Sequence, residues 1–168
     1  YIEKSDFAEA PPPKFQRLKP DGEVRLMGAY IVKCNEIIKD ENGEIAEIRC
    51  TADLETGNGM PADGRKVKGT IHWVSAAHAV DADLYLYDNL LTIENANDLP
   101  EGKDYLDYLN PESLKKLTGC KLEPSLAEAK EGERFQFVRM GYYVKDREPG
   151  RFNRIVTLKD SFAKTLQK

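Results

Sequence analysis

The chain has 168 residues, with 25 Lys and Arg against 29 Asp and Glu, and a formal net charge of −4 at pH 7. This length allows one domain of ordinary size or two small ones, each with a modest hydrophobic core. No apolar run is long enough to span a bilayer, and residues 1–7 are polar and mixed in charge, unlike a signal peptide. We therefore expect a cytoplasmic protein with no membrane partner. Because the chain starts with Tyr rather than Met, we also expect a piece of a longer polypeptide.

The charge is unevenly distributed. Residues 1–80 carry a net charge of −2, residues 81–133 carry −8, and residues 134–168 carry +6. A basic C-terminal third can attract phosphate locally although the whole chain is acidic. The alternative is that these charges only solvate a surface, so the pattern permits a nucleic-acid partner without requiring one.

The cysteines and histidines lack the spacing of a metal site. Cys34, Cys50 and Cys120 are odd in number and widely separated, with no Cys-x-x-Cys pair. His72 and His78 do not match the i, i+4 spacing of helical metal ligands. We expect reduced, packed cysteines and no bound metal.

The first elements expected are a connector and a hairpin. Residues 1–22 include three consecutive prolines, which favour a stiff extended segment leading into the first folded unit. Residues 23–38 have the alternation of a strand packed on both sides, and the Asn-Gly signal in residues 40–43 predicts a turn. A second strand is expected over 44–52, followed by a long Gly-rich loop over 53–64.

The most distinctive segment covers residues 64–79 and reads GRKVKGTIHWVSAAHA. Its residues alternate, as in a strand with one polar and one apolar face, and we expect Ile71 and Trp73 in the core. A corner at 75–77 then leads to another alternating strand from Val80 to Tyr87. Four or five strands before residue 92 favour a small closed or nearly closed barrel.

A change of unit is expected near residue 92, because residues 92–110 are rich in Asn, Asp, Pro and Gly. Residues 110–113 either begin a helical turn or lead into a strand. A one- to two-turn helix is expected at 124–130, with Pro in its first turn. The last elements expected are strands over 134–144 and 152–158, joined by a turn at 145–151. The pattern predicts an all-β chain of two units with short helical segments.

The sequence contains no convincing catalytic constellation. Gly57-Asn58-Gly59 is not a phosphate-binding loop, and neither Gly-x-Ser-x-Gly nor His-Glu-x-x-His occurs. A binding site is more plausible, since RNA is read mainly in single-stranded loops by long donors and planar groups. Two sets of such residues occur, around Arg17 and Arg25, and around Gln136 and Arg139.

Several motifs point together to one family. Besides the run at 64–79, they are Glu23-Val24-Arg25-Leu26, LYLYDNLL at 84–91, NPESL at 110–114, EPSL at 123–126, FQF at 135–137, Gly141-Tyr142 and Phe152-Asn153-Arg154. In this order they resemble the C-terminal anticodon-binding region of the bacterial glutaminyl-tRNA synthetases, over nearly the whole chain. The ATP-site signatures of class I synthetases, HIGH and KMSKS, are absent. The fragment is therefore expected to be non-catalytic alone and to need no cofactor.

The resemblance implies two small β-barrels stacked along the tRNA. The distal barrel would cover residues 23–91 and the proximal barrel residues 92–168, the latter incomplete at its N-terminal side. The whole enzyme would be a glutamine-tRNA ligase that uses ATP and Mg²⁺. Its implied partners are the anticodon loop of the tRNA for glutamine and the catalytic domain of the same polypeptide, and we expect a monomer.

The resemblance also implies roles for residues of the first unit. Arg17 would read the third anticodon base with Gln16 close to the loop, and Arg25 would serve the first base. The alternatives are a solvated charge for Arg17 and an edge-strand charge for Arg25. Gln16 and Met27 stand where relatives have Lys and Arg, so we expect neutral hydrogen bonds or apolar stacking to replace some charged contacts.

In the second unit, Gln136 and Arg139 would serve the central U of the anticodon, and Ser161 would support them. Alternatively, Gln136 is an ordinary outward-facing strand residue. In a regular strand these two side chains would point to opposite faces, so they converge only if the strand has a bulge or bend, aided by Gly141.

Two other readings remain open. One is the same region of a glutamyl-tRNA synthetase of the archaeal and eukaryotic type, which shares the two-barrel architecture. The other is a structural RNA-binding barrel, such as a ribosomal protein that holds 5S RNA. The run at 64–79 and the FQF motif favour the glutamine enzyme over the first of these.

Overall fold

The computed structural model of the chain describes residues 1–158. It divides into two compact units, Tyr1–Ala76 and Ala77–Lys168. The described residues form nine strands and three short 3₁₀ helices, with no α-helix among them. No helix in this part of the chain is long and apolar enough to cross a membrane. For residues 1–158, the expected all-β class with short helical segments is confirmed.

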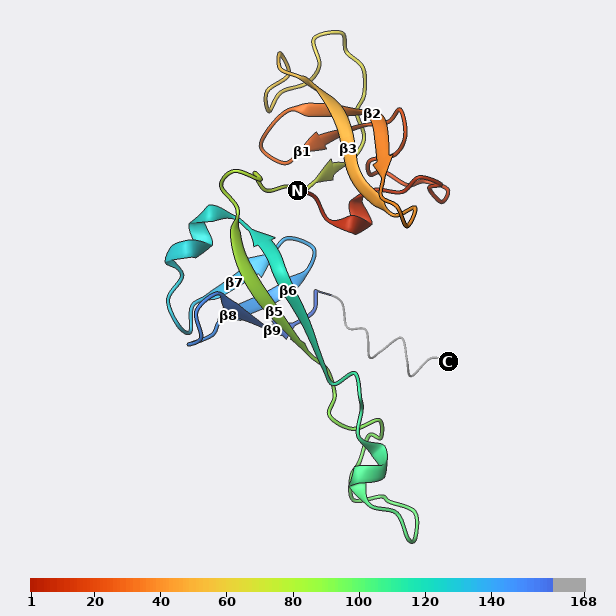
Figure 1. The fold of residues 1–168 in the computed structure, drawn as a ribbon, viewed down its shortest axis with the longest axis vertical. Coiled ribbons are helices and arrows are strands. Elements are labelled where there is room, and N and C mark those ends of the chain that lie inside the picture. Colours follow the sequence, from red (N-terminus) through yellow and green to blue (C-terminus); the bar gives the residue numbers. More distant parts are fainter. Residues whose placement is uncertain (159–168) are drawn as a thin grey trace. The chain divides into compact units, whose positions relative to one another are not determined.

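The first unit is built on a four-stranded mixed sheet in the order β3-β2-β1-β4. Its strands β1, β2 and β3 are labelled in Figure 1. Its elements are the 3₁₀ helix η1 (Lys4–Asp6) and the strands β1 (Glu23–Leu26), β2 (Ile31–Lys39), β3 (Ile45–Asp53) and β4 (Thr70–Ile71). β1 and β3 run antiparallel to β2, whereas β4 runs parallel to β1. Isolated bridges join Ile2 to Trp73 and Phe7 to Leu18.

The strand expected over 23–38 is wrong, because the chain reverses between β1 and β2. Gly28 has φ +69°, and the Leu26 N–H donates to the Tyr30 carbonyl at 2.9 Å. A glycine adopts this left-handed conformation without steric cost, which allows the tight turn. The next hairpin is confirmed: β2 pairs with β3, and the Gly43 N–H donates to the Asp40 carbonyl at 3.0 Å.

The run at 64–79 forms less strand than expected. Only Thr70 and Ile71 pair as a strand, and they pair with Arg25 and Leu26. Ile71 is fully buried, as expected. Trp73 is only half-buried, and its indole N–H donates to the Met27 carbonyl at 3.0 Å, so it holds the β1–β2 turn more than it fills the core.

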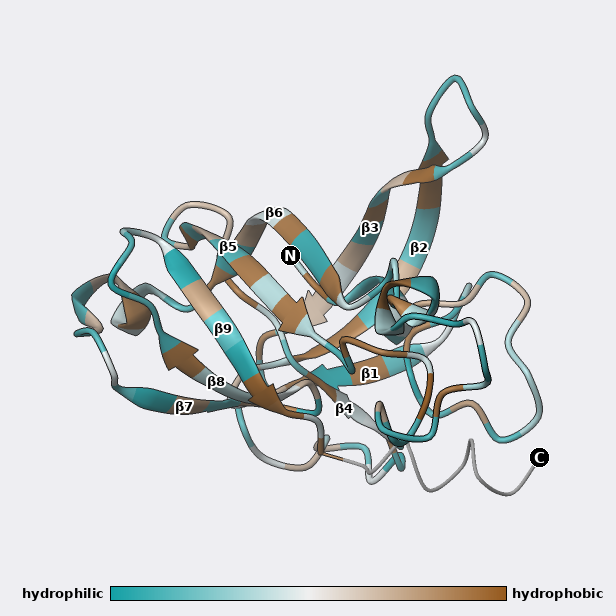
Figure 2. Ribbon diagram, turned by 90° about the horizontal axis from the view of Figure 1, so that it is seen from below, coloured by the Kyte–Doolittle hydropathy of each residue, from teal (hydrophilic) through white to brown (hydrophobic). Residues whose placement is uncertain are grey.

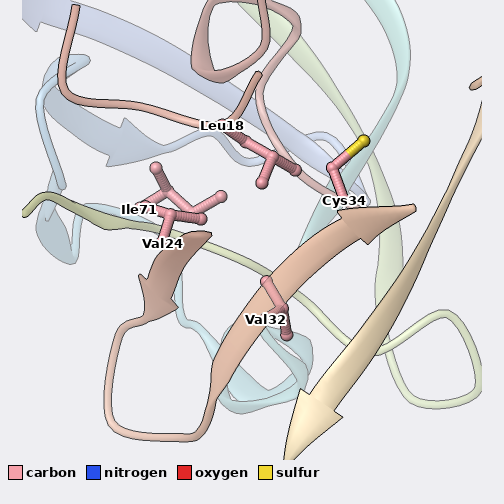
Figure 3. Packing of buried hydrophobic residues seen from close by; sticks show 5 residues of the cluster. All are labelled: Leu18, Val24, Val32, Cys34 and Ile71. Atoms are coloured by element: carbon pink, nitrogen blue, oxygen red, sulfur yellow. The ribbon is translucent and has the colours of Figure 1, made fainter. Parts of the chain in front are cut away.

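The core of the first unit collects side chains from distant parts of the sequence. Its buried members are Leu18, Val24, Val32, Cys34 and Ile71 (Figure 3). Leu18 lies within residues 1–22, which we expected to serve as a connector, so this segment contributes to the folded unit. Of the three cysteines only Cys34 is fully buried, whereas Cys120 is half-buried and Cys50 is exposed.

The second unit is built on a five-stranded mixed sheet in the order β6-β5-β9-β8-β7. Its strands are β5 (Val80–Tyr87), β6 (Leu114–Leu122), β7 (Arg134–Phe137), β8 (Gly141–Lys145) and β9 (Arg151–Val156), with 3₁₀ helices η2 (Tyr105–Tyr108) and η3 (Pro124–Glu128). β9 runs parallel to β5 and antiparallel to β8. In both units the end strands have one neighbour each, so the described ladders do not close into the expected barrels.

The division between the units lies at residues 76 and 77, earlier than the change expected near residue 92. The reason is the pairing of β5, whose two neighbours, β6 and β9, both come later in the chain. β5 has the expected alternation, with Ala82 and Leu84 buried and hydrophobic and hydrophilic residues succeeding each other (Figure 2). Residues 88–113 form an excursion between β5 and β6 instead of a boundary (Figure 1).

Two further predictions are resolved in the second unit. Residues 110–113 lead into a strand, β6, which had not been expected as a separate element. The single strand expected over 134–144 is wrong, because a turn at 138–140 separates β7 from β8. The short helix at 124–130 is confirmed as η3, with Pro124 in its first turn.

We expect Ile71→Val to destabilise the first unit by about 0.5 to 1.5 kcal/mol, because it removes one buried methyl group without allowing full collapse. Ile45→Val is the matched control, since Ile45 is also in a strand of this unit but is 40% exposed. Urea unfolding followed by circular dichroism measures both. Equal losses would contradict a core position for Ile71.

Candidate nucleic-acid interface

Arg17 is an anchored side chain and not a solvated charge. Its Nη1 donates to the Ser5 carbonyl at 2.8 Å, and its Nε lies 3.3 Å from Oδ1 of Asp6. The Asp6 side chain is fully buried, whereas that of Arg17 is 38% exposed. The guanidinium is therefore fixed on one side by the protein and open to solvent on the other.

Gln16 precedes Arg17 and has an exposed side chain, while its backbone is covered by the run at 64–79. Gly69 has φ +94°, and a Cβ at this position would lie 1.8 Å from the Gln16 carbonyl oxygen. Only glycine permits so close an approach. The same residue accepts a hydrogen bond from the Arg25 N–H at 3.2 Å, so Gly69 connects the Gln16 segment to β1.

Arg25 is occupied by backbone carbonyls. Its Nη1 donates to Gly57 at 2.9 Å and to Ala29 at 3.3 Å, and its Nη2 donates to Gly59. The side chain thus ties the loop after β3 to the β1–β2 turn. Because β1 lies between β2 and β4, Arg25 is not on an edge strand, and that alternative is wrong.

Arg65 has a structural role that the sequence analysis missed. Its guanidinium contacts three carboxylates, those of Asp53 at 2.5 Å, Asp63 at 2.7 Å and Glu23 at 3.1 Å. Hydrogen bonds from Arg65 lower the pKa of Asp53 and, chiefly through its backbone N–H, the pKa of Asp63. The three acceptors raise the pKa of Arg65 itself. Arg65 therefore closes the base of the loop at 54–64. In the sequence, the only local indication of these contacts is Asp63, two residues before Arg65.

Gln136 and Arg139 lie on one hairpin of the second unit. Gln136 is exposed on β7, opposite Tyr142 of β8. Arg139 is exposed in the intervening turn, where its φ is +64°. The expected bend is therefore a complete chain reversal, closed by a 2.9 Å hydrogen bond from the Met140 N–H to the Phe137 carbonyl.

Most of the aromatic side chains near this hairpin are structural. Phe137 stacks on the fully buried Tyr143 with ring centroids 4.3 Å apart, and Phe135 meets Phe152 edge-on at 6.0 Å. Tyr142 is 43% exposed and remains available for contact. The buried rings hold the hairpin to the sheet, so they support Gln136 and Arg139 indirectly.

Gly141 fixes the end of the same hairpin next to β9. A Cβ there would lie 2.6 Å from the Val156 carbonyl oxygen and 3.5 Å from Cδ of Arg154. Arg154, the last residue of the Phe152-Asn153-Arg154 motif, is thus a cationic neighbour of the hairpin. Ser161, the remaining candidate, lies outside the described residues.

The structure thus gathers the candidates into two groups in separate units. The first comprises Gln16, Arg17 and Arg25, and the second comprises Gln136 and Arg139. Two family models with the same description, the anticodon-binding domain of the class I tRNA synthetases for glutamate and glutamine (E and Q), match residues 1–53 and residues 70–146. The chain belongs to this family.

Individual proteins to which the chain is similar include glutamine-tRNA ligases. That of Ectopseudomonas mendocina is 53% identical over 167 residues, which cover 96% of this chain and 30% of the relative. That of Xanthomonas campestris pv. campestris (strain 8004) is 52% identical over 169 residues, which cover 98% of this chain and 29% of the relative. The chain therefore spans less than a third of these relatives and corresponds to the anticodon-binding region, as the sequence motifs predicted.

We expect Gly69→Ala to displace the Gln16 backbone and to cost about 1 to 3 kcal/mol more than a change without a clash, because overpacking forces the surroundings to move. Gly43→Ala is the matched control, since Gly43 has φ +79° but nothing within 4 Å of a Cβ. Chemical unfolding compares the two variants. Equal destabilisation would show that the contact at Gly69 yields easily.

Arg65→Gln should open the loop at 54–64, because the loop loses the cation that holds both of its ends. Limited chymotrypsin digestion detects this as faster cleavage at the exposed Leu54 and Met60. Arg49→Gln is the control, since Arg49 also contacts two carboxylates but is 59% exposed on the β2–β3 hairpin. Equal cleavage of the two variants would contradict the role of Arg65.

The same substitution should change the response to acid. Because the pKa values of Asp53 and Asp63 are lowered in the folded state, their pairing stabilises the fold at neutral pH and is lost as the pH falls below the ordinary Asp value of 3.8. The stability advantage of the unsubstituted protein over Arg65→Gln should shrink in this range. Thermal unfolding from pH 6 downward measures it, and a constant difference would be evidence against the pairing.

Proposed function

We propose that this chain serves as the tRNA-reading part of a glutamine-tRNA ligase and binds the anticodon loop of the tRNA for glutamine. The observation that carries the proposal is the similarity at 52 to 53% identity over 96 to 98% of the chain to relatives that bear that name. The finer architecture proposed is a pair of small barrels, one for each unit. The isolated bridges Ile2 to Trp73 and Phe7 to Leu18 support it in the first unit, since they add pairing beyond the ladder.

The whole protein would join glutamine to its tRNA with ATP and Mg²⁺. The residues described here do not fit such a centre, because no group of three His, Cys, Asp or Glu side chains among residues 1–158 is placed to hold a metal ion. We therefore assign ATP and Mg²⁺ to the part of the relatives that this chain does not span. That catalytic part is a proposed partner within the same polypeptide.

Recognition of the third anticodon base is assigned to Arg17, with Gln16 beside it. Glutamine codons begin with C, so this base is G, whose O6 and N7 acceptors match the fork of a guanidinium. The exposed part of the Arg17 guanidinium can supply such a fork. Gln16 offers a neutral amide beside Arg17, which makes recognition of this base less dependent on charge.

The central U is assigned to Gln136 and Arg139 at the β7–β8 hairpin. Both side chains are exposed, and the turn removes the conflict of strand parity. Splayed bases in an RNA loop offer hydrogen-bonding edges to such donors. Ser161 is retained as a supporting residue on the strength of the sequence resemblance alone.

The role proposed for Arg25 is indirect. Because its two terminal nitrogens donate to three carbonyls, the side chain shapes the surface around the first anticodon base by holding the β1–β2 turn against the loop at 54–64. Met27, 42% exposed in that turn, is then the side chain that faces the solvent. An apolar contact with the base replaces the charged one that relatives would make.

The glutamyl-tRNA synthetase reading shares the family description but receives less support. The family models cover both enzymes, whereas the relatives at 52 to 53% identity are glutamine-tRNA ligases. A ribosomal RNA-binding barrel receives none from these comparisons. The glutamine tRNA is therefore the substrate to test first.

We expect Arg139→Ala to weaken binding of a glutamine anticodon stem-loop by about tenfold or more, since one base-edge contact contributes about 1 to 3 kcal/mol. Arg17→Ala should mainly reduce discrimination at the third base. Arg147→Ala is the matched control, because Arg147 belongs to the same unit as Arg139 and is 79% exposed. Fluorescence anisotropy with loops altered at one base measures each effect, and unchanged affinity and base preference would remove these residues from the site.

A further inference from the structure

Asp6 is a buried carboxylate that has no role in the anticodon recognition proposed above. Among residues 1–158 it is the one charged residue that is fully buried, with 0% of its surface exposed. Removing a carboxylate from water is costly unless a cation and hydrogen bonds compensate it. Arg17 is a cation beside it, with its Nε 3.3 Å from Oδ1 of Asp6.

The backbone around Asp6 fixes the register of this pair. The Leu18 N–H donates to the Asp6 carbonyl at 3.0 Å, and the Ala8 N–H donates to the Leu18 carbonyl at 3.2 Å. Phe7 and Leu18 form a parallel bridge, and Leu18 is buried in the core. Residue 17 is therefore held between a core residue and Gln16, whose carbonyl is covered by Gly69.

The contacts of Arg17 divide its guanidinium into a held part and a presented part. Nε faces Asp6, and one N–H of Nη1 is used by the Ser5 carbonyl. A guanidinium carries five N–H donors, so the second N–H of Nη1 and both of Nη2 remain. Within residues 1–158, Nη2 has no hydrogen-bond partner, and the side chain is 38% exposed.

We propose that Asp6 is the positioning residue for selection at the third anticodon base: it orients the Arg17 guanidinium so that its remaining donors meet a guanine edge. This inference rests on the function proposed for Arg17. Ordering a long side chain before binding removes an entropy cost that would otherwise weaken the contact. Asp6 itself does not touch the RNA.

The positioning role of Asp6 predicts an effect on the preference for the third base without a loss of overall affinity for RNA. Without Asp6, Arg17 keeps its charge and still attracts phosphate, and loss of a carboxylate reduces repulsion of the RNA. Loops of any sequence should then bind about as well as before or better, while the preference for the correct third base falls. A purely structural role for Asp6 would lower stability without this shift in base preference.

The test uses this chain with the Asp6→Asn variant, which keeps the size of the side chain and removes its charge. The affinity for a glutamine anticodon stem-loop is divided by that for a loop with A in place of G at the third position. We expect this ratio to fall about two- to tenfold, as for the loss of one ordered side chain. The corresponding ratio for the central base should stay unchanged, because its readers lie in the other unit.

Asp40→Asn is the control, since Asp40 also accepts hydrogen bonds in the first unit but lies in the exposed turn after β2. It should change neither ratio. An unchanged third-base ratio in folded Asp6→Asn overturns the proposal, as does a parallel fall of both ratios. Circular dichroism establishes that the variant is folded.

Arg17→Lys keeps the inference testable if Asp6→Asn does not fold. Lys retains the charge and can pair with Asp6, but it lacks the planar fork, so affinity should hold and the third-base ratio should fall. A retained ratio overturns the proposal. Arg17→Ala distinguishes failure of the role of Asp6 from failure of the function proposed for Arg17. If Arg17→Ala abolishes the third-base preference while Asp6→Asn preserves it, only the role of Asp6 fails. If Arg17→Ala preserves the third-base preference, the function proposed for Arg17 fails as well.

Discussion

The close approach of Gly69 to the Gln16 carbonyl is the contact on which the arrangement of the first unit depends. It lets β4 lie beside β1 while the segment before β1 passes directly over the chain, with Ile71 and Leu18 reaching one core. Because the approach leaves no room for a Cβ, the path of the run at 64–79 requires a glycine at position 69. This segment is in this sense a scaffold of the first unit, and it fixes the backbone at Gln16, the residue before Arg17.

The arginines of the first unit show why a residue type alone does not reveal a role. Arg17, Arg25 and Arg65 are all bound within the protein, but to different partners: a buried carboxylate, backbone carbonyls and a set of half-exposed carboxylates. A guanidinium with five donors can satisfy the fold and still contact a ligand. Arg17 has the larger share of its donors left, whereas both terminal nitrogens of Arg25 are engaged. This difference is the basis for proposing that Arg17 reads a base whereas Arg25 shapes the surface.

Patterns of neighbouring residues predicted local structure well. They failed where contacts between segments far apart in the sequence determine the structure. The Asn42-Gly43 turn and the alternation of β5 depend on neighbouring residues and were predictable. The reversals at Gly28 and Arg139 were not, because the flanking residues continue a strand-like alternation across the turn. The candidate residues were found through motifs, but the engagement of Arg25 and the contacts of Arg65 were hidden, since their partners lie up to 42 residues away.

The position of β9 has a consequence for synthesis of the protein on the ribosome. The sheet of the first unit uses strands that end at Ile71, so it can be completed as soon as that part of the chain has emerged. In the second unit β9 is inserted between β5 and β8, although it is the last strand in the sequence of the described residues. Until residues 151–156 appear, β5 and β8 each present an unpaired edge, the kind of surface that favours misassembly and chaperone binding. The sheet of the first unit can therefore be completed earlier than that of the second unit, which requires residues 151–156.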